Sequence, residues 1–400
     1  MFSSLNTEKK ESLLESYDSR NHPFFYKSSE GTIRSEGVGL MVDAVPMNDR
    51  EFSTRLALAF DTASKQGIKD PVIVGAIPFN REQKPFLHIP LQVQKESGVN
   101  CGEPSELAAI SGEVEWEEIP KKNMYEQMVE KGVAEINKGA IEKIVLGRRL
   151  QLITNGTVDR TKILTNLASV NQAGFTFAVD LEGRHSEQTT LMGASPELLV
   201  RKKGNQLSIN PLAGSRPRTS DPKQDVRLAE ELMSSEKDLH EHAFVVDAII
   251  DQLRPICKDI KVPDQPSVIA TKTMWHLSTY ITAVPKNEYQ SASALAKILH
   301  PTPAVCGFSR DQAAAKIKEI EQEDRAFFTG LVGWENAAGD GEWAIAIRCA
   351  EVSTEQVELF AGAGIVASSD PREEAEETHA KFQTMLQALE CANKGGLSDE

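Results

Sequence analysis

Hydrophobic and polar residues alternate in several short segments of the C-terminal two-thirds of the chain. A two-residue period places successive side chains on opposite faces, which is typical of strands that bury one face. Many of these segments follow one another without an intervening helix of crossover length, so the pattern favours antiparallel sheets over alternating βαβ units. Strands are predicted at residues 143–154, 174–181, 197–203, 342–352 and 357–366.

Apolar residues recur at helical spacing in three other segments. Long helices are predicted at residues 224–253 and 371–393, and a shorter helix at 48–66 precedes a strand at 71–79. Helices that accompany antiparallel sheets pack on the outside of the sheets. The predicted fold class is therefore α+β.

Residues 97–120 combine Gly, Pro, Ser and many acidic residues, a composition that is typical of a surface connection. This segment separates an N-terminal part from a C-terminal part that is richer in motifs. With 400 residues and 40% hydrophobic content, the chain can bury a large core. Length alone leaves the number of domains open.

Acidic residues outnumber basic ones, 59 to 44, and the formal net charge is −15. This balance disfavours non-specific binding to nucleic acids and to anionic membrane surfaces, so an acidic ligand needs a local basic pocket or a bound cation. The five cysteines are scattered, with no CxxC pair, and are expected to be reduced. No apolar run approaches the length of a membrane span and the N-terminus lacks a secretory signal, so a cytoplasmic protein is expected.

One stripe of the predicted C-terminal helix carries polar and charged side chains that could form part of a functional site. Glu374, Glu377, Thr378 and Lys381 stand at positions i, i+3, i+4 and i+7, so they share one side of the helix beside an apolar stripe. Two interpretations stay open: a solvated face held by salt bridges, or carboxylates that face a cavity.

A second acidic helix contains Glu241 within the segment EKDLHEH, residues 236–242. Carboxylates from two separate helices suit a hard cation such as Mg²⁺, which prefers oxygen ligands. Zinc is a weaker interpretation of His240 and His242, because residues two apart on a helix point to different faces and no cysteine pair accompanies them.

Two ionisable residues stand at the starts of predicted strands, Lys143 and Glu197. Each is interpreted either as an exposed strand end or as a buried group with a shifted pKa. A desolvated lysine can serve as a general base, and a buried, protonated glutamic acid can serve as a general acid.

Arg348 interrupts an otherwise apolar alternating segment, where a buried guanidinium needs either an internal acidic partner or an anionic ligand. The glycine-containing segments 211–218 and 361–364 can present backbone N–H groups to a carboxylate. Neither segment is a GxGxxG or a Walker motif, which excludes a Rossmann interpretation.

A series of motifs, in this order along the chain, resembles the chorismate-utilising enzyme family. The resemblance covers about residues 124–393, whereas residues 1–120 are less distinctive. The motifs are KIVLGRRL, GASPELL, PLAGSRPR, EKDLHEH, MWHLST, HPTPAVCGF, RAFFTGLVGW, EWAIAIRCA and AGAGIVASSDPREEAEETHAK.

The resemblance implies one large domain over residues 1–400, with two large antiparallel sheets packed as a sandwich around the active site and helices outside. It also implies that Mg²⁺ bridges protein carboxylates and a carboxylate of the substrate, chorismate. By position in the motifs, the implied metal ligands are Glu241 and Glu377, with Glu374, Glu376 and Asp238 near them. The implied substrate contacts are Gly214, Ser215, His276, Ala304, Arg348, Gly362 and Lys381.

Particular residues indicate which branch of the family this chain resembles. Members that make isochorismate resemble this chain in carrying a lysine at the position of Lys143, where it activates water for attack at ring carbon C2, while Glu197 protonates the hydroxyl that leaves C4. Aminodeoxychorismate-forming members carry a nucleophilic lysine where this chain has Ala213. Aminating and salicylate-forming members commonly have threonine at the position of Ala304 and tyrosine at that of Phe328.

The resemblance therefore predicts an isochorismate synthase of the type associated with dihydroxybenzoate siderophores; menaquinone and salicylate pathways stay open. The alternatives are a salicylate synthase, which also releases pyruvate, and a non-catalytic chorismate sensor. Retention of Lys143 and Glu197 argues against the sensor, because binding does not need their tuned protonation states. Water is the expected nucleophile, so no amidotransferase subunit is expected, and a monomer is predicted.

Overall fold

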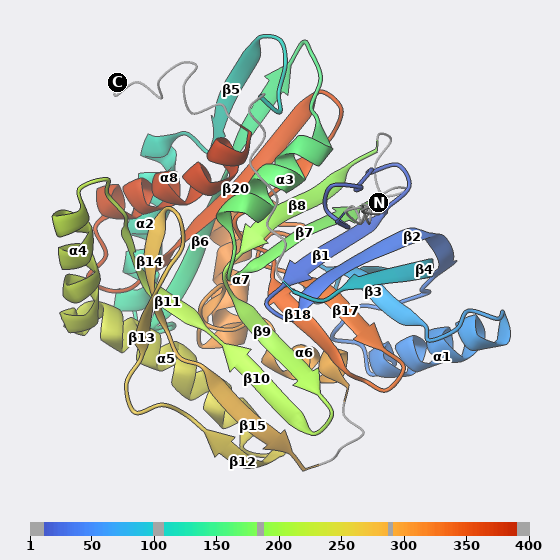
Figure 1. Ribbon diagram of the computed structural model, residues 1–400. Coiled ribbons are helices and arrows are strands. Elements are labelled where there is room, and N and C mark those ends of the chain that lie inside the picture. Colours follow the sequence, from blue (N-terminus) through green and yellow to red (C-terminus); the bar gives the residue numbers. More distant parts are fainter. Residues whose placement is uncertain (1–11, 99–107, 182–187, 287–290, 390–400) are drawn as a thin grey trace, which may run out of the picture.

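A continuous antiparallel sheet organises the protein (Figure 1). The computed structural model describes residues 12–98, 108–181, 188–286 and 291–389. Within them, every strand pairing is antiparallel, and 17 strands form one sheet. In order of hydrogen-bonded neighbours these are β5 (Val114–Ile119), β6 (Lys143–Thr154), β20 (Gln356–Ile365), β19 (Cys349–Val352), β8 (Thr190–Ser195), β7 (Phe175–Asp180), β1 (Phe24–Ser28), β2 (Gly31–Met41), β4 (Phe86–Glu96), β3 (Val72–Ile77), β17 (Leu331–Asn336), β18 (Gly341–Ile345), β9 (Leu198–Lys203), β10 (Gln206–Asn210), β15 (Ile281–Pro285) and β12 (Cys257–Lys261), while β16 (Gly307–Phe308) pairs with the first residues of β6.

The sheet folds over on itself, so that its two halves form layers. Buried side chains from β7, β8 and β20 belong to the same core cluster as buried side chains from β3, β17 and β18. One direct contact between the layers is the stack of Phe360 on Phe328, whose ring centroids are 5.5 Å apart. The predicted sandwich of antiparallel layers is confirmed, and hydrogen bonding continues from one layer to the other through β1, β2 and β4.

Helices cover the outer faces of both layers, as the α+β prediction requires (Figure 1). Helices α1, α5 and α6 pack on the layer that contains β3, β9 and β18, whereas α3 and α8 pack on the layer that contains β8 and β20, and α2 and α7 cover β6. The helices are α1 (Phe52–Lys65), α2 (Lys122–Asn137), α3 (Arg160–Val170), α4 (Pro222–Ser234), α5 (Glu236–Leu253), α6 (Ala292–Leu299), α7 (Arg310–Glu321) and α8 (Pro371–Ala388).

A separate sheet of three strands lies beside the region where the large sheet folds over on itself. Its strands are β11 (Leu212–Pro217), β14 (Met274–Ser278) and β13 (Ser267–Ala270), with β14 in the middle. The register places Ser215 of β11 opposite His276 of β14. In the described part of the chain, this small sheet shares no strand pairing with the large one, so side-chain contacts and α4 hold it in place.

Helix α8 is fixed to β6 by one buried arginine. Arg148 of β6 donates hydrogen bonds to the hydroxyl of Thr378 at 2.8 Å and to the carbonyl of Ala375 at 3.2 Å. It also pairs with Glu118 of β5 at 3.1 Å. Because Ala375 and Thr378 flank the acidic residues of α8, this arginine sets the position of those acidic residues relative to β6.

Three predicted elements differ from the structure. The helix predicted at 224–253 is two helices, because Ser235 has extended backbone and its side chain accepts a hydrogen bond from the N–H of Asp238, which caps α5. The strand predicted at 342–352 is broken between β18 and β19, where Arg348 has φ of 50°. Residues 97–120 are not only a connection, since β5 pairs with β6 along its length.

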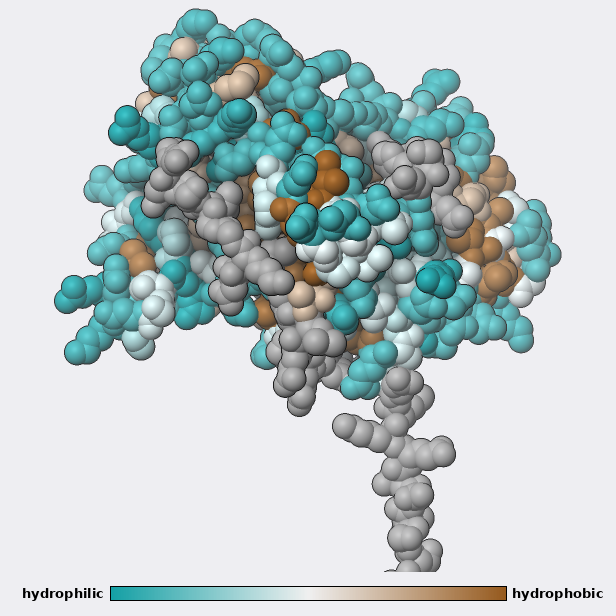
Figure 2. Space-filling model, turned by 90° about the horizontal axis from the view of Figure 1, so that it is seen from above, coloured by the Kyte–Doolittle hydropathy of each residue, from teal (hydrophilic) through white to brown (hydrophobic). Residues whose placement is uncertain are grey.

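The molecular surface agrees with the polar composition. Figure 2 shows a face that is mainly hydrophilic, with apolar residues in small separate patches. No helix in the described residues is long and apolar enough to span a membrane. Cys257, Cys306 and Cys349 are buried free thiols, while Cys101 and Cys391 lie outside the described residues.

Candidate active site

A pocket of about 560 Å³ lies where the two layers and the small sheet meet. Its apolar wall includes Phe328 and Phe360, the stacked pair that joins the layers. Many of the predicted site residues line this pocket, although they come from distant parts of the chain. These are Glu197, Ser215, His276, Ala304, Arg348, Gly362 and Lys381.

A second compartment of about 530 Å³ adjoins the first and is more acidic. The two share Ser215, Ala304, Gly362 and Lys381, so they form one continuous site. The predicted metal ligands line the second compartment, together with other charged groups from β11, α5 and α8. These lining residues are Gly214, Arg216, Lys237, Asp238, Glu241, Glu374 and Glu377.

Glu197 is buried at the junction of β8 and β9, with 3% of its surface exposed. Burial raises the pKa of its carboxyl group to about 8, against the lowering effects of the Leu212 backbone and of nearby positive charges. The carboxyl group therefore holds its proton at neutral pH. The interpretation of Glu197 as an exposed strand-entry carboxylate is wrong.

Lys143 is also buried, with 1% of its surface exposed. Its Nζ lies 2.8 Å from Oε1 of Glu241 on α5, so the first residue of β6 reaches the acidic compartment. Gly364 of β20 leaves room for this pair: a Cβ there would lie 2.7 Å from Glu241 Oε1 and 3.4 Å from Lys143 Nζ. The interpretation of Lys143 as an exposed strand end is wrong.

Arg348 projects from the break between β18 and β19 into the first pocket. Within the described residues it makes no ion pair with a carboxylate, although only 6% of its surface is exposed. Its Nη2 lies 3.4 Å from Nε2 of His276. A buried guanidinium without an internal acidic partner favours the interpretation that Arg348 meets an anionic ligand.

His276 is a neutral imidazole in this site. Its Nδ1 lies 2.7 Å from the hydroxyl oxygen of Ser215. Burial, followed by the positive charges of Arg348 and Lys381, holds the pKa of His276 well below its usual value. The ring can therefore lie beside a ligand as a hydrogen-bonding group without adding a charge.

The acidic stripe of α8 faces the second compartment. Glu374 is buried, with 3% of its surface exposed, and Glu377 pairs with Lys381 at 2.5 Å. Lys381 also donates a hydrogen bond to the carbonyl of Gly362 at 2.8 Å. The interpretation of this row as a solvated face is wrong for these residues.

Glu376 does not belong to the site, which corrects the prediction that it lies near the metal ligands. Its side chain is 65% exposed and pairs with Lys122 of α2 at 2.5 Å. The physical reason is helical geometry, since Glu376 is displaced by about 100° around α8 from Glu377. Asp238 does line the second compartment, where it pairs with Arg216 at 2.6 Å.

The electrostatics of the second compartment fit a hard cation. Burial, followed by the charges of Glu377 and Glu241, raises the pKa of Glu374 to about 7. Although burial raises the pKa of Glu377, the charges of Lys381, Arg348 and Lys237 together lower it below its usual value. Carboxylate oxygens that repel one another are suitable ligands for Mg²⁺. The described residues contain no compact group of three or more metal-binding side chains, and lysines pair with the acidic groups instead.

The two histidines of α5 do not form a zinc site. His242 is buried and bonds through its ring to the hydroxyl of Thr279 at 2.7 Å and to the carbonyl of Ala213 at 3.2 Å. The ring of His240 packs on Phe244, with centroids 4.6 Å apart. Both histidines therefore have structural neighbours on different sides of the helix.

Sequence reasoning missed Lys237, which lies 3.6 Å from Glu374 and lines the acidic compartment. Its spacing of i to i+4 from Glu241 on α5 could have placed it on the same side of the helix. The apolar wall of Val145, Phe328 and Phe360 was not predicted as a group, because it is assembled from three separate elements.

Comparisons with known proteins all indicate the same family. A family model described as chorismate binding enzyme matches residues 87–390. The chain is 43% identical to isochorismate synthase DhbC of Bacillus subtilis, over 95% of this chain and 96% of that protein. It is 39% identical to isochorismate synthase EntC of Escherichia coli, over 91% of this chain and 93% of that protein. The crystal structure of a putative 2,3-dihydroxybenzoate-specific isochorismate synthase, DhbC of Bacillus anthracis, superposes with a TM-score of 0.89 at 43% identity, covering 94% of this chain and 98% of that one.

Replacement of Arg348 by methionine tests whether this guanidinium has an internal partner. We expect Arg348→Met to change the free energy of unfolding of the ligand-free protein by less than about 1 kcal/mol, because no carboxylate among the described residues forms an ion pair with this guanidinium. Arg148→Met is the matched control, and it should destabilise the protein by about 3 kcal/mol because its guanidinium has several internal partners. Chemical denaturation measures both, and equal losses would contradict the assignment of Arg348 to an external anion.

Proposed function

This chain belongs to the chorismate binding enzyme family, and from that premise we propose that it is an isochorismate synthase. The observation that supports this most directly is the placement of Glu197 and Lys143. Glu197 is a buried acid that holds its proton at neutral pH, and Lys143 is a buried amine that pairs with Glu241, a lining residue of the adjoining acidic compartment. General acid and base groups with separate environments are what an exchange of two hydroxyl groups needs.

The proposed reaction exchanges one hydroxyl group for another. A water molecule attacks ring carbon C2 while Lys143 accepts the proton that the water loses. Both ring double bonds shift by one position, from C1=C2 to C1=C6 and from C5=C6 to C4=C5. The bond between C4 and its oxygen breaks, and Glu197 donates its proton to the departing hydroxyl group, which leaves as water. Proton return from Lys143 to Glu197 through solvent restores the starting state, so atoms and charges balance. Each of these groups contributes about 10²-fold or more to the rate.

The cationic groups of the first pocket bind the substrate carboxylates. Arg348 has no internal acidic partner among the described residues and offers a bidentate contact. Lys381, fixed by the carbonyl of Gly362, supplies a second positive charge at the junction of the compartments. Ser215 and neutral His276 lie beside the ring, and the Phe328 and Phe360 wall excludes water from its apolar edge.

Glu241 and Glu377 are the residues that would hold Mg²⁺ in the acidic compartment, with Glu374 beside them. A bound Mg²⁺ would supply positive charge to neutralise a substrate carboxylate. The support is that Glu241, Glu374 and Glu377 line one compartment, where burial, followed by the charges of Glu377 and Glu241, raises the pKa of Glu374. Lys143 and Lys381, which pair with two of these carboxylates, are the groups that offset the negative charge in the absence of a cation.

The product serves a dihydroxybenzoate siderophore pathway in the cytoplasm. The support is the name of the structural relative, a putative 2,3-dihydroxybenzoate-specific isochorismate synthase, and the high identity to DhbC. Because water is the nucleophile, the enzyme acts without an ammonia-supplying amidotransferase subunit, and it functions as a monomer.

Product analysis tests the proposed reaction. The purified chain, incubated with chorismate and Mg²⁺, should form isochorismate without pyruvate, and removal of Mg²⁺ with a chelator should abolish turnover. Chromatography with mass and NMR detection identifies the products. Glu377→Ala should raise the Mg²⁺ concentration that turnover requires. Salicylate with pyruvate would assign a salicylate synthase instead, and chorismate binding without any product would assign a sensor.

The acid and base roles predict a second set of results. Lys143→Ala and Glu197→Gln should bind chorismate with near-normal affinity but lose about 10²-fold or more in kcat. In the unmodified enzyme kcat/KM should fall as the pH rises through about 8, because Glu197 must be protonated to donate and loses its proton there. Steady-state kinetics across pH, with calorimetric binding of chorismate, checks both. Full activity of Glu197→Gln, or loss of folding in both variants, would contradict these roles.

A further inference from the structure

The arginines of the motif PLAGSRPR and the tryptophan of MWHLST take no part in the proposed chemistry, yet they meet in space. Arg216 and Arg218 are two residues apart, so both point to the same side of β11 and its continuation. Arg216 pairs with Asp238 at the start of α5, with Nη2 2.6 Å from Oδ2. Arg218 pairs with Asp225 of α4, with Nη2 2.7 Å and Nε 3.1 Å from Oδ2.

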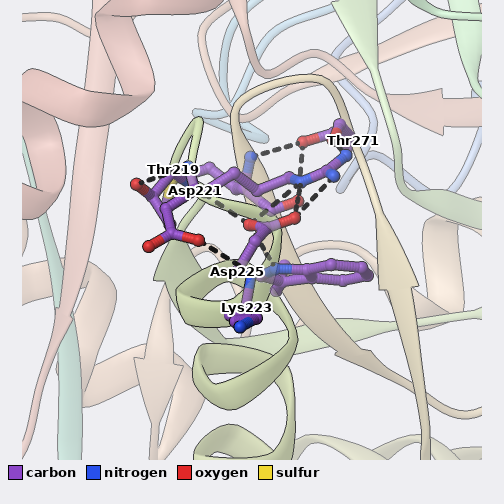
Figure 3. Close-up of polar contacts among 8 residues, drawn as sticks. Thr219, Asp221, Lys223, Asp225 and Thr271 are labelled. Carbon is purple, nitrogen blue, oxygen red and sulfur yellow. Dashed lines mark hydrogen bonds and ion pairs between the residues drawn. The ribbon is translucent and has the colours of Figure 1, made fainter.

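Asp225 is the centre of a network that joins three segments (Figure 3). Besides Arg218, it accepts hydrogen bonds from the backbone N–H of Thr219 at 3.1 Å and from the indole N–H of Trp275 at 3.0 Å. Arg218 lies over the Trp275 ring, 4.6 Å from its centroid, and donates to the carbonyl of Thr271 at 3.1 Å. One carboxylate thus holds together α4, the end of β11 and the turn between β13 and β14.

Capping of α4 does not explain this arrangement. The N-cap of α4 is Asp221, whose side chain accepts from the N–H of Lys223 at 2.9 Å. Asp225 lies one turn further on and is 6% exposed, and Asp225 and Leu232 are the buried residues of α4. The helix does not need a buried carboxylate at this position for its own stability. The contacts of Asp225 with other elements explain its burial.

The network is one residue away from the substrate site on both strands. Trp275 precedes His276, and the register pairs Arg216 with Trp275 and Ser215 with His276. The small sheet has no strand pairing with the large sheet in the described residues, so the packing of α4 and α5 on it and contacts such as those of Asp225 fix its position. A shift of β14 would therefore move His276 and its 2.7 Å contact with Ser215.

We propose that Asp225 is a positioning residue for the substrate site. Through Arg218 and Trp275 it fixes the small sheet against α4, which keeps His276 of β14 aligned beside the substrate ring and in contact with Ser215. Asp225 lines neither compartment of the site, so it acts through His276 and not by contact with the substrate. This proposal rests on the proposed function for its kinetic readout.

The test compares two aspartates on neighbouring turns of one helix. Asp225→Asn should lower kcat/KM for chorismate about tenfold, because small misplacements of a binding group have effects of this order. Asp221→Asn, which removes the same charge from the start of α4, should stay within about twofold of the unmodified enzyme. Both are assayed well below their melting temperatures. Equal kinetics of the two variants, or a lower melting temperature of Asp225→Asn with unchanged kcat and KM, would overturn the proposal.

A double-mutant cycle separates positioning through His276 from a general structural effect. In a His276→Ala background, Asp225→Asn should cause no further loss of kcat/KM, because the group that it positions is gone. Independent, multiplicative losses would overturn the proposal. If Asp225→Asn does not fold, Trp275→Phe replaces it in the cycle. This variant removes the indole N–H contact to Asp225 and part of the ring on which Arg218 lies, and it should cause a loss of a few-fold that also disappears in the His276→Ala background.

Chorismate dissociation constants of the same variants, from titration calorimetry, keep this proposal distinct from the proposed function. Asp225→Asn should weaken binding about tenfold and Asp221→Asn should not. If the unmodified chain binds chorismate but forms no isochorismate, the proposed function fails while the binding comparison still decides the role of Asp225. If the unmodified chain is active and both variants bind and turn over alike, only the positioning role fails.

Discussion

The enclosure of charged groups between two sheet layers is the constraint on which the site depends. A charge removed from water must find a counter-charge or give up its charged form. Lys143 and Lys381 find glutamates, while Glu197 keeps its proton because burial raises its pKa to about 8. Arg348 has neither solution within the described residues. The site thus contains a positive charge, on Arg348, that an anionic ligand can pair with.

The fold supplies these charges from elements that are distant in sequence but adjacent in space. Strands β6 and β20 pair along ten residue positions, which brings Lys143 close to Gly364. The lack of a side chain at Gly364 leaves space for Glu241 from α5, and the carbonyl of Gly362 accepts a hydrogen bond from Lys381 of α8. Arg148, on the opposite face of β6, holds α8 in the register that points Glu377 inward. One strand therefore carries Lys143, the proposed general base, on one face and an anchor for the acidic helix on the other.

Much of this arrangement could be predicted from the sequence, and the exceptions have physical reasons. Period-two alternation gave β6 with its correct ends, and the resemblance to the chorismate-utilising enzymes is confirmed by the family match. Alternation could not reveal the break at Arg348, because a single left-handed residue does not disturb the apolar pattern around it. Spacing identified the stripe of α8 but not its burial, which depends on tertiary packing, and the resemblance alone suggested Glu376, which helical geometry excludes.

In the proposed reaction, water enters at one ring carbon while a different hydroxyl group leaves, and separate protein groups act on each. Turnover of chorismate in water labelled with oxygen-18 tests this exchange, with the product analysed by mass spectrometry and carbon-13 NMR. We expect one labelled oxygen in each isochorismate molecule, located on the C2 hydroxyl group. Isochorismate that carries no label would mean that the original hydroxyl group migrates within the substrate, which would contradict the roles assigned to Lys143 and Glu197.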